Sequence, residues 1–585
     1  MKRFFGFVVG SVLTLGSPAF AAPPAAAAPL LRILIKAGAM SESKGGDVDI
    51  TLSIPDVQFP AGATFLKIGT RVPGMVRSQS VRDMAVSDAG GPARMVLHDA
   101  ASSLTWQTTR ALAGDVTVHY LIRAENIPLA AGGPAVQLRV DGNGFSGQGD
   151  MIIAAPQIQT PYRIGIEWDL AAMGRGAMGV SSYGDGNVEI PAGPIARLGS
   201  IVLMGGVMQR YVSGPFEAVW TGTPNFNPRP AMQWVARLHH WMSGFWRSAS
   251  EPPYRVFLRF DPMNAGTGAA LTHSFIATYG KGVTGENLKP ILAHEMTHTF
   301  TASDDMQKWY NEGIAVYYGS TLLTPWLAGL TTTDQFLGHL NEVAATYYTD
   351  VKRSLPESQV LPNFWKDTRI RILAYDRGGM YFAVLNQMEL EASGGKHLIG
   401  YPIRTMNARI EAGQPLSEDI WLALLRKDLG PAGPALHHKL LSGGLIVPTS
   451  GAFGPCFRRV VRKIPMFDLG FAMKSLPLFG PKIIQGLRPG SNAAKAGLRN
   501  GDRVSYAAAL DDVQSNVHET LTLHVTRAGR TFTMTYLPRG KSVDTYQWER
   551  IPGVPESACK APYRNTLAAT KHWLATKIQR AETRQ

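Results

Sequence analysis

A histidine pair separated by one helical turn is the feature of this sequence most able to do chemistry. His294-Glu295-Met296-Thr297-His298 has the pattern HExxH and lies in a stretch with helical periodicity, where Pro290 is tolerated near the first turn. Histidines four residues apart project from one helix face, so both imidazoles could bind one zinc ion at about 2.0 to 2.1 Å. Glu295 would then be angled toward a water molecule on the metal rather than toward the metal. The same pattern arises by chance in roughly one or two of a hundred chains of this length, and then marks an ordinary helix with two solvated or capped histidines.

A third ligand follows the histidine pair. A catalytic zinc normally takes three protein ligands and leaves a fourth position for water. Glu312 lies in Trp309-Tyr310-Asn311-Glu312-Gly313-Ile314-Ala315, which reads as a second helix, and it offers the missing carboxylate. The sequence therefore predicts a zinc site at His294, His298 and Glu312.

HExxH followed by a second helix bearing Asn-Glu-Gly-x-Ala resembles the gluzincin metallopeptidases, the aminopeptidase-N and glycyl aminopeptidase group. The resemblance implies one Zn²⁺ per chain on His294, His298 and Glu312, with Glu295 as the general base that moves a proton from water to the leaving amine. Thirteen residues separate His298 from Glu312, fewer than in aminopeptidase N. We therefore expect a shortened connection between the two helices, which a surface loop tolerates.

A tyrosine motif extends the resemblance. These families carry a catalytic tyrosine in Tyr-x-Lys/Arg-Gly on a later helix, and this chain has Tyr375-Asp376-Arg377-Gly378. The resemblance implies that the Tyr375 hydroxyl donates a hydrogen bond to the oxyanion of the tetrahedral intermediate. The alternative is an ordinary tyrosine on a helix surface.

A Gly-rich segment matches the families' substrate-binding edge strand, whose backbone pairs with an extended peptide. The resemblance assigns this role to Gly268, Ala269, Ala270, Leu271, Thr272 and His273. Relatives place a glutamate here that holds the free amine of the substrate, whereas this chain has Leu271-Thr272. That departure leaves exopeptidase and endopeptidase action both open, and we expect a structural hydrogen-bonding role for His273.

A later segment resembles a bacterial PDZ domain, and a PDZ-like unit after a gluzincin core is the arrangement of the glycyl aminopeptidase family. The matching stretches are Phe467 to Ala472, Gly486 to Leu498 and Asn500 to Val504. The resemblance implies that Leu469, Gly470 and Phe471 present backbone N–H groups to a C-terminal carboxylate. Too few residues separate Asp502 from the strand at 521–525 for the usual groove-forming helix. A peptide-binding domain and a structural brace are therefore both open.

The elements that position these residues give a multidomain α+β chain. Alternating apolar residues and Gly-Pro turns predict a β-sandwich-like domain over residues 30–161. A gluzincin catalytic domain, thermolysin-like and mostly helical, is expected over 162–450, with strands at 254–260 and 269–278. A PDZ-like β domain over 465–550 and a partly helical tail over 551–585 complete the chain.

The N-terminus predicts export. Lys2 and Arg3, an apolar run from Phe4 to Leu15 and Ala19-Phe20-Ala21 form a signal peptide over residues 1–21, and an Ala/Pro linker follows over 22–29. The run is too short to cross a hydrocarbon core of about 30 Å unless it stays uncleaved and extended, so we expect no stable membrane anchor and a bacterial periplasmic location.

Export bears on the two cysteines of the chain, Cys456 and Cys559. An oxidising compartment permits a disulfide between them, which would close a loop of about 100 residues and contribute about 4 to 5 kcal/mol in the chain-entropy treatment. The alternative is two unpaired buried thiols.

The amino-acid composition excludes two other classes of protein. The chain has 585 residues, 45% hydrophobic and 17% charged, so it is neither disordered nor collagenous. Its net charge of +14 is spread out, and the densest basic cluster, Arg458, Arg459, Arg462 and Lys463, is interrupted by two valines. We expect no nucleic-acid partner and leave the oligomeric state open.

The sequence thus predicts an exported zinc-dependent peptidase that acts on peptides or proteins with a metal-activated water. Two alternatives stay open: a non-catalytic periplasmic peptide-binding protein that uses its PDZ-like domain, and a zinc hydrolase of a non-peptide substrate.

Overall fold

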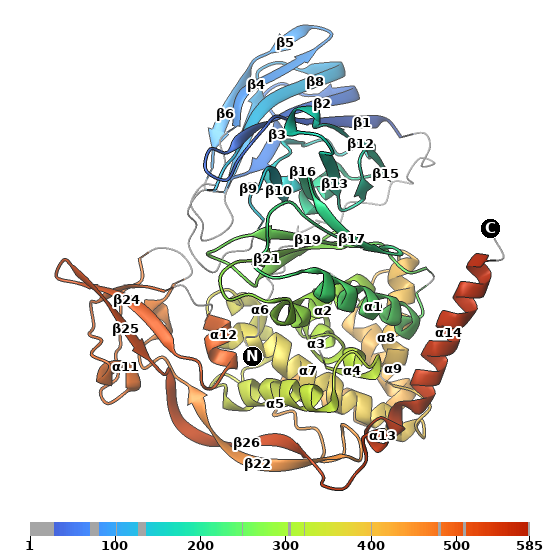
Figure 1. Cartoon of the computed structure of the whole chain (residues 1–585), viewed down its shortest axis with the longest axis vertical. Coiled ribbons are helices and arrows are strands. Elements are labelled where there is room, and N and C mark those ends of the chain that lie inside the picture. The colour runs from blue at the N-terminus through green and yellow to red at the C-terminus, as the bar shows by residue number, and fades with distance from the viewer. Residues whose placement is uncertain are drawn as a thin grey trace. The chain divides into compact units, whose positions relative to one another are not determined.

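The computed structural model describes residues 28–582, with internal gaps at 71–80, 101, 127–135, 249, 302–305, 321, 399, 478–480 and 507–509. The expected signal peptide and all but the last two residues of the expected linker lie outside the described residues. The described chain forms two compact units: residues 28–229 with 253–284, called here the β unit, and residues 230–252 with 285–582, called the helical unit. The protein is a multidomain α+β chain with several sheets (Figure 1).

The largest sheet of the β unit follows from alternating side chains. Val48, Ile50, Leu52 and Ile54 are each at most 1% exposed, which confirms the predicted alternation along their strand. Seven strands lie in the order β15-β12-β1-β2-β8-β4-β5. They are β1 (Leu30–Ala37), β2 (Gly46–Phe59), β4 (Val81–Asp88), β5 (Gly91–Ala93), β8 (Leu112–Ala124), β12 (Tyr162–Asp169) and β15 (Val188–Gly193).

Two smaller sheets complete the first part of the β unit. A four-stranded sheet shares one hydrophobic core with the large sheet, where Leu66 and Trp106 join Leu52 and Tyr120. Its order is β11 (Ala155–Pro156), β3 (Thr64–Gly69), β7 (Ser103–Thr108) and β6 (Met95–Asp99). A five-stranded sheet has the order β14 (Gly184–Asp185), β13 (Met178–Ser181), β16 (Val202–Gly206), β10 (Gly144–Gln148) and β9 (Arg139–Asp141).

The domain boundary expected at residue 161 does not fall between structural units. β12 starts at Tyr162 and pairs in parallel with β1, with Leu30 opposite Arg163 and Lys36 opposite Asp169. The chain therefore stays within the β unit well beyond residue 161. Parallel pairing joins strands that are far apart in sequence and leaves no local pattern, so the sequence could not place it.

The remaining sheet of the β unit has the order β17-β18-β19-β21-β20. Its strands are β17 (Gln209–Ser213), β18 (Phe216–Trp220), β19 (Tyr254–Phe260), β20 (Gly268–Leu271) and β21 (Ser274–Tyr279). The strand predicted at 254–260 is confirmed. The single strand predicted at 269–278 is wrong, because the chain reverses between Leu271 and Ser274, where His273 has a φ of +45°. No glycine or proline marks this turn in the sequence.

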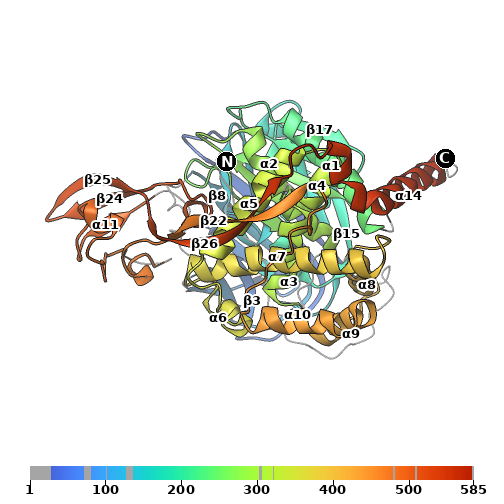
Figure 2. The same ribbon diagram turned by 90° about the horizontal axis from the view of Figure 1, so that it is seen from below.

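The helical unit contains a first helix that the sequence did not predict and the helices that the periodicity from Leu288 to about residue 445 predicts. They are α1 (Arg229–Trp246), α2 (Gly285–Thr301), α3 (Lys308–Tyr318), α4 (Leu323–Leu327), α5 (Thr333–Thr349), α6 (Val360–Asn363), α7 (Thr368–Ala392), α8 (Gly400–Glu411), α9 (Glu418–Leu429) and α10 (Ala432–Leu441). α7 is the central helix of the unit and packs against α3, α5, α6, α9 and α10 (Figure 2). Its start is fixed by Asp367, whose side chain accepts a hydrogen bond from the Arg369 backbone N–H at 3.0 Å.

A long antiparallel ribbon follows the helices. β22 (Phe457–Phe467) pairs with β26 (Arg539–Arg550), and the ribbon lies along α5 (Figure 1). Residues 467–536, called here the C-terminal module, have a hydrophobic core of their own, which includes Phe467, Ile484, Val513 and Leu523. The module contains α11 (Asn492–Lys495), β23 (Arg503–Ser505), α12 (Leu510–Ser515), β24 (Leu521–Arg527) and β25 (Arg530–Tyr536). The tail holds α13 (Glu556–Cys559) and α14 (Arg564–Glu582).

A disulfide joins the two ends of this region. Cys456 and Cys559 are fully buried, their Cα atoms lie 5.0 Å apart, and their sulfur atoms are bonded. The two cysteines are 103 residues apart in sequence, and the segment between them contains the ribbon and the C-terminal module.

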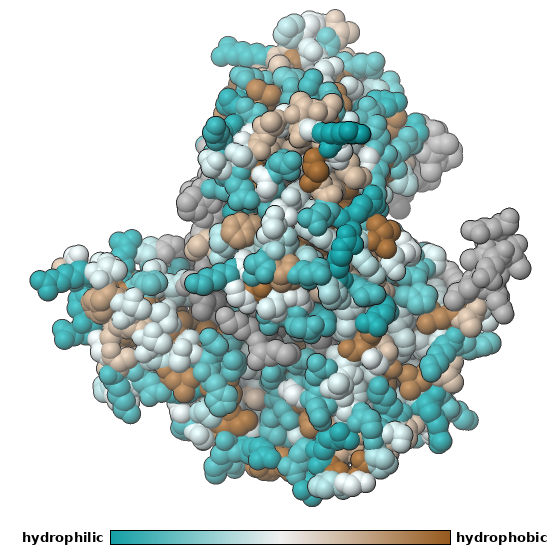
Figure 3. Space-filling view, viewed as in Figure 1, coloured by the Kyte–Doolittle hydropathy of each residue, from teal (hydrophilic) through white to brown (hydrophobic). Residues whose placement is uncertain are grey.

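None of the described helices is long and apolar enough to cross a bilayer. On the face seen in Figure 3, hydrophobic residues are interspersed among hydrophilic ones.

Candidate active site

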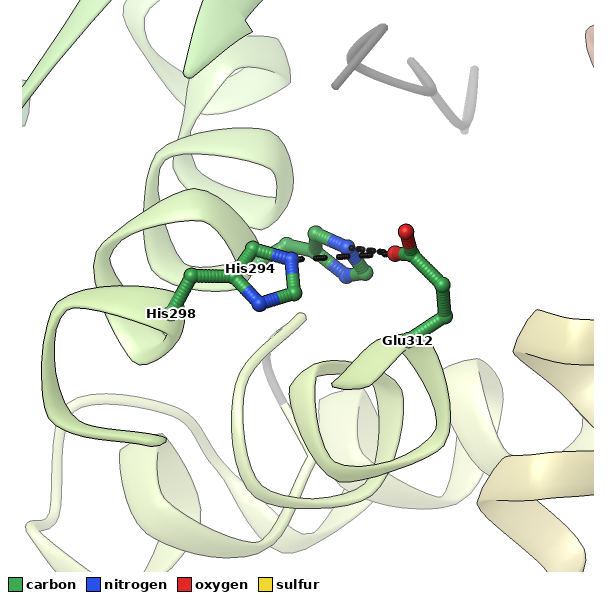
Figure 4. Close-up of side chains that lie close together, drawn as sticks. All are labelled: His294, His298 and Glu312. Atoms are coloured by element: carbon green, nitrogen blue, oxygen red, sulfur yellow. Dashed lines mark hydrogen bonds and ion pairs between the residues drawn. The ribbon is translucent and has the colours of Figure 1, made fainter. Parts of the chain in front are cut away.

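Two helices of the helical unit bring the three expected zinc ligands together. His294 and His298 lie one turn apart on α2, and Glu312 lies on α3. Both imidazoles point toward the Glu312 carboxylate (Figure 4). Their ligand atoms all lie within 4.8 Å of one another.

The distances suit a single small cation. Nε2 of His294 lies 3.2 Å from Oε2 of Glu312, and Nε2 of His298 lies 3.6 Å from the same oxygen. Two ligand atoms that share a tetrahedral zinc ion lie roughly 3.4 Å apart. Two imidazoles and one carboxylate are also the ligand set of several catalytic zinc sites, so the residues fit zinc.

The electrostatics of the three residues are strongly coupled. Burial by itself raises the pKa of Glu312, but the close contacts with His294 and His298 outweigh burial and hold that pKa well below its ordinary value. Burial lowers the pKa of His298, but the contact with Glu312 outweighs it, so this pKa is raised overall. The site therefore concentrates a carboxylate charge between two imidazoles, where a divalent cation would be attracted.

Glu295 is buried beside the ligands without a partner. The residue is 2% exposed, and neither of its carboxylate oxygens has a hydrogen-bond partner among the described residues. Burial raises the pKa of Glu295 above its ordinary value, although the neighbouring imidazoles of His294 and His298 oppose the rise. A buried carboxylate without a partner is costly, and a raised pKa is the property that a general base near neutral pH requires.

Tyr375 on α7 lies next to the first histidine. Its ring stacks on the His294 ring with centroids 5.7 Å apart, and the centroid of the Phe364 ring lies 6.4 Å from that of Tyr375. Burial and the negative charges of Glu312 and Glu295 raise the pKa of Tyr375 well above its ordinary value, so the phenol keeps its proton and remains a hydrogen-bond donor. The alternative of an ordinary tyrosine on a helix surface is therefore excluded, because Tyr375 is 5% exposed.

Arg377, the basic residue of the tyrosine motif, has a structural position. Its guanidinium is fully buried, forms an ion pair with Glu357 and donates a hydrogen bond to the Leu355 carbonyl. It anchors α7 to the segment that precedes α6 and does not reach the candidate metal ligands through any of these contacts.

The expected substrate-binding residues lie at an edge of the β unit's last sheet. Among the described residues, β21 is the strand that pairs with β20, and Gly268 through Leu271 oppose Ala277 through Ser274. A side chain at Gly268 would collide with the Ile276 carbonyl oxygen, so glycine is required there. Thr272 donates its backbone N–H to Ser200, and burial lowers the pKa of His273. An edge strand with one unpaired side can accept an extended peptide, and no carboxylate is present at Leu271 or Thr272.

Sequence reasoning missed a residue that contacts the ligands. Ser320, two residues after α3, lies with its hydroxyl oxygen 3.0 Å from Nδ1 of His294. No motif marks it, because serine is common after helices and its contact with α2 depends on how α3 packs.

Most of the chain resembles a solved protein in its fold. A crystal structure of an aminopeptidase N family protein from Idiomarina loihiensis aligns with a TM-score of 0.61 over 91% of this chain and 99% of that chain, at 12% identity. The chain has the fold of that aminopeptidase N family protein. An M1 zinc metallopeptidase from Deinococcus radiodurans (14% identity, 72% of this chain and 96% of that chain, TM-score 0.41) and yeast LTA4 hydrolase (13% identity, 72% and 68%, TM-score 0.42) also align. No family model and no curated protein matches the sequence.

The short helix α12 of the C-terminal module packs against α5 and α7. Asp511 forms a bidentate ion pair with Arg371 of α7, at 2.7 Å and 3.1 Å. Gln514 reaches Asp350 at 3.4 Å, while Val513 enters the core of the module. A helix of six residues is thus present between Asp502 and β24, and two of its side chains contact Arg371 and Asp350.

The expected carboxylate-binding loop is partly occupied by its own chain. Leu469 and Phe471 are buried, and the Gly470 N–H donates to the Asp468 carboxylate at 2.8 Å. Asp468 also forms an ion pair with Arg488. A peptide carboxylate at Gly470 would have to displace Asp468.

Proposed function

We propose that this chain is a zinc-dependent peptidase. The observation that carries the proposal is the convergence of His294, His298 and Glu312 around one point, with the partnerless carboxylate of Glu295 buried beside them. The fold shared with an aminopeptidase N family protein supports it. Three ligands leave a position open for water or substrate, which distinguishes a catalytic from a structural site.

Each residue of the site has its own role in the proposed reaction. When bound by His294, His298 and Glu312, zinc would supply Lewis-acid chemistry, polarising a carbonyl and lowering the pKa of a water molecule toward about 7. Glu295 takes the proton of the attacking water and delivers it to the leaving amine, for which its raised pKa and its freedom from other partners are suited. Tyr375 keeps its phenolic proton and donates it in a hydrogen bond to the carbonyl oxygen as negative charge develops there.

The substrate is proposed to be a peptide, and β20 is proposed to bind peptide backbone by strand addition. Leu271 and Thr272 offer no carboxylate to hold a free α-amine. We therefore expect peptides with free and with acetylated N-termini to be cleaved at similar rates. A peptide library presented in both forms measures this directly, and cleavage confined to free N-termini would show aminopeptidase action.

The central experiment replaces Glu295 by glutamine. The variant keeps the ligand set and the side-chain shape, so it should retain one zinc ion per chain and the wild-type unfolding midpoint, while hydrolysis falls about 10²- to 10⁴-fold. Glu312→Gln is the matched control, since the same chemical change at a ligand should release zinc. Full activity in Glu295→Gln, or no stoichiometric zinc in the wild-type protein, would overturn the proposal, and the second result would favour a non-catalytic binding protein.

We further propose export to the bacterial periplasm. The support is the charged, apolar and small-residue pattern of residues 1–21 and the buried disulfide between Cys456 and Cys559, which suits an oxidising compartment. Fractionation of cells that express the full chain tests this location.

A further inference from the structure

Ser320 is placed against the first zinc-binding histidine by an unusual backbone. α3 ends at Tyr318, Gly319 follows, and Ser320 has a φ of +40°, a left-handed conformation that residues other than glycine seldom adopt. Such conformations cost about 1 to 3 kcal/mol and persist where the surrounding structure requires them. The strain at Ser320 therefore calls for a compensating contact.

The packing of Gly319 against α2 fixes where Ser320 lies. A methyl group on Gly319 would lie 2.5 Å from the Thr297 hydroxyl oxygen and 2.8 Å from the Ala293 carbonyl oxygen. The chain after α3 thus touches the turn of α2 that carries His294. Because Gly319 has no side chain, the next residue can reach the imidazole.

The His294 ring contacts the Ser320 hydroxyl, which makes a second hydrogen bond of its own. Nδ1 of His294 lies 3.0 Å from the Ser320 hydroxyl oxygen, and this hydroxyl donates to the Ala315 carbonyl at 3.4 Å. Since the hydroxyl proton is directed to a carbonyl, the oxygen accepts the Nδ1 proton of the imidazole. The proton is held on Nδ1, and Nε2 faces Glu312 at 3.2 Å.

We propose that Ser320 is a positioning residue for the metal site. It holds His294 in the tautomer and ring orientation that direct the Nε2 lone pair at the cation, and the fold accepts strain at Ser320 to do so. This inference rests on the proposed zinc site. Residues that hydrogen-bond to the second nitrogen of a ligating histidine typically change metal affinity by about 10- to 100-fold when they are removed.

Two variants distinguish the effect of losing the Ser320 hydroxyl from the effect of relieving the backbone strain. Ser320→Gly removes the hydroxyl and relieves the strain, whereas Ser320→Ala removes the hydroxyl and keeps the strain. We expect both variants to bind zinc about 10- to 100-fold more weakly than wild type in a chelator competition. In thermal unfolding of the chelator-treated proteins, the midpoint of the glycine variant should lie at or above that of wild type. The midpoint of the alanine variant should lie below that of the glycine variant.

A matched control uses another strained position. Ala528, in the turn between β24 and β25, has a φ of +48°. Ala528→Gly should raise the unfolding midpoint of the chelator-treated protein and leave zinc affinity at the wild-type value. Wild-type zinc affinity in Ser320→Gly would overturn the inference alone, whereas absence of zinc binding in the wild-type protein would overturn the proposed function as well.

Discussion

Gly313 and Gly378 touch where α3 packs against α7. A methyl group on Gly313 would lie 2.7 Å from the carbonyl carbon of Gly378, and one on Gly378 would lie 2.8 Å from the Trp309 carbonyl oxygen. A methyl group cannot approach a backbone so closely, so only glycine lets the two helices meet at this distance. Glu312 precedes Gly313, and Tyr375 lies one turn before Gly378. The contact therefore sets how far the carboxylate ligand lies from the phenol.

Gly313→Ala tests this contact. The added methyl group forces α3 away from α7, so we expect a loss of about 1 to 3 kcal/mol in the free energy of unfolding and weaker zinc binding as Glu312 moves. Gly338→Ala is the control, because Gly338 is exposed on α5 with open space around it, and alanine there should add about 0.5 to 1 kcal/mol. Urea unfolding and chelator competition measure both quantities. Equal stability gains in the two variants would contradict the role of the glycine contact.

Tyr375→Phe removes one hydroxyl and keeps the ring that stacks on His294. If the phenol stabilises the oxyanion, kcat falls by about 10²- to 10³-fold, or about 2.7 to 4 kcal/mol, while zinc content and KM change little. Steady-state kinetics on a cleaved peptide with metal analysis of the same samples check this. A tyrosine that only packs against His294 would leave kcat within about twofold of wild type.

A histidine pair on α1 predicts a pH-dependent stability. Glu251 accepts hydrogen bonds from Nδ1 of His239 and of His240, each at 2.9 Å. Burial by itself raises the pKa of Glu251, but the two histidines lower it from 4.5 to about 2. The hydrogen bond to Glu251 raises the pKa of His240 above 6.5.

The directions of these two pKa shifts define the pH range in which the contact stabilises the protein. The depressed carboxyl contributes stability above about pH 4.5 that is lost as the pH falls toward 2, and the raised imidazole contributes stability below about pH 6.5 that is lost as the pH rises through its folded pKa. Glu251→Gln should therefore destabilise the protein most between pH 4.5 and 6.5, by about 1 to 2 kcal/mol. Thermal unfolding at pH 3, 5.5 and 9 measures the difference from wild type. Glu286→Gln, at an exposed carboxylate paired with Lys289, should have little effect at any of these values.

Reduction of the disulfide should lower stability. Cys456 and Cys559 close a loop with a sequence separation of 103, so cleavage of the bond is expected to cost about 4 to 5 kcal/mol in the free energy of unfolding. The double variant Cys456→Ala, Cys559→Ala should match the reduced wild-type protein in denaturant midpoint and be insensitive to reductant. An oxidised wild-type protein no more stable than the double variant would show that the bridge contributes nothing.

The C-terminal module is expected to brace α7 and not to capture chain termini. Asp511 of α12 forms an ion pair with Arg371, which lies one turn before Tyr375 on α7. Asp468 already accepts the hydrogen bond of the Gly470 N–H. Asp511→Ala should cost about 1.5 to 3 kcal/mol in the free energy of unfolding because it removes the carboxylate that pairs with the Arg371 side chain, which is 14% exposed. Peptides with free apolar C-termini should bind the Glu295→Gln variant equally well before and after amidation. A preference for the free carboxylate, abolished by substitution at Gly470, would show a peptide-binding module.

The candidate ligands could be predicted from the sequence because their spacing is local. His294 and His298 share a helix face by the period of the α-helix alone, and Glu312 follows in a recognisable motif on the next helix. The apolar alternation of β2 and the helical periodicity from Leu288 onward likewise reflect short-range geometry. Each of these predictions depends on residues a few positions apart.

Contacts between distant segments were decided only by the tertiary structure. The parallel pairing of β1 with β12, the turn at His273, the glycine contact of α3 with α7 and the reach of Ser320 to His294 all depend on packing that no local pattern encodes. The sequence by itself determined which side chains can bind zinc, because helical periodicity and ligand chemistry are properties of short segments. The tertiary structure decided which partners orient those side chains, since close packing joins residues that the chain keeps far apart.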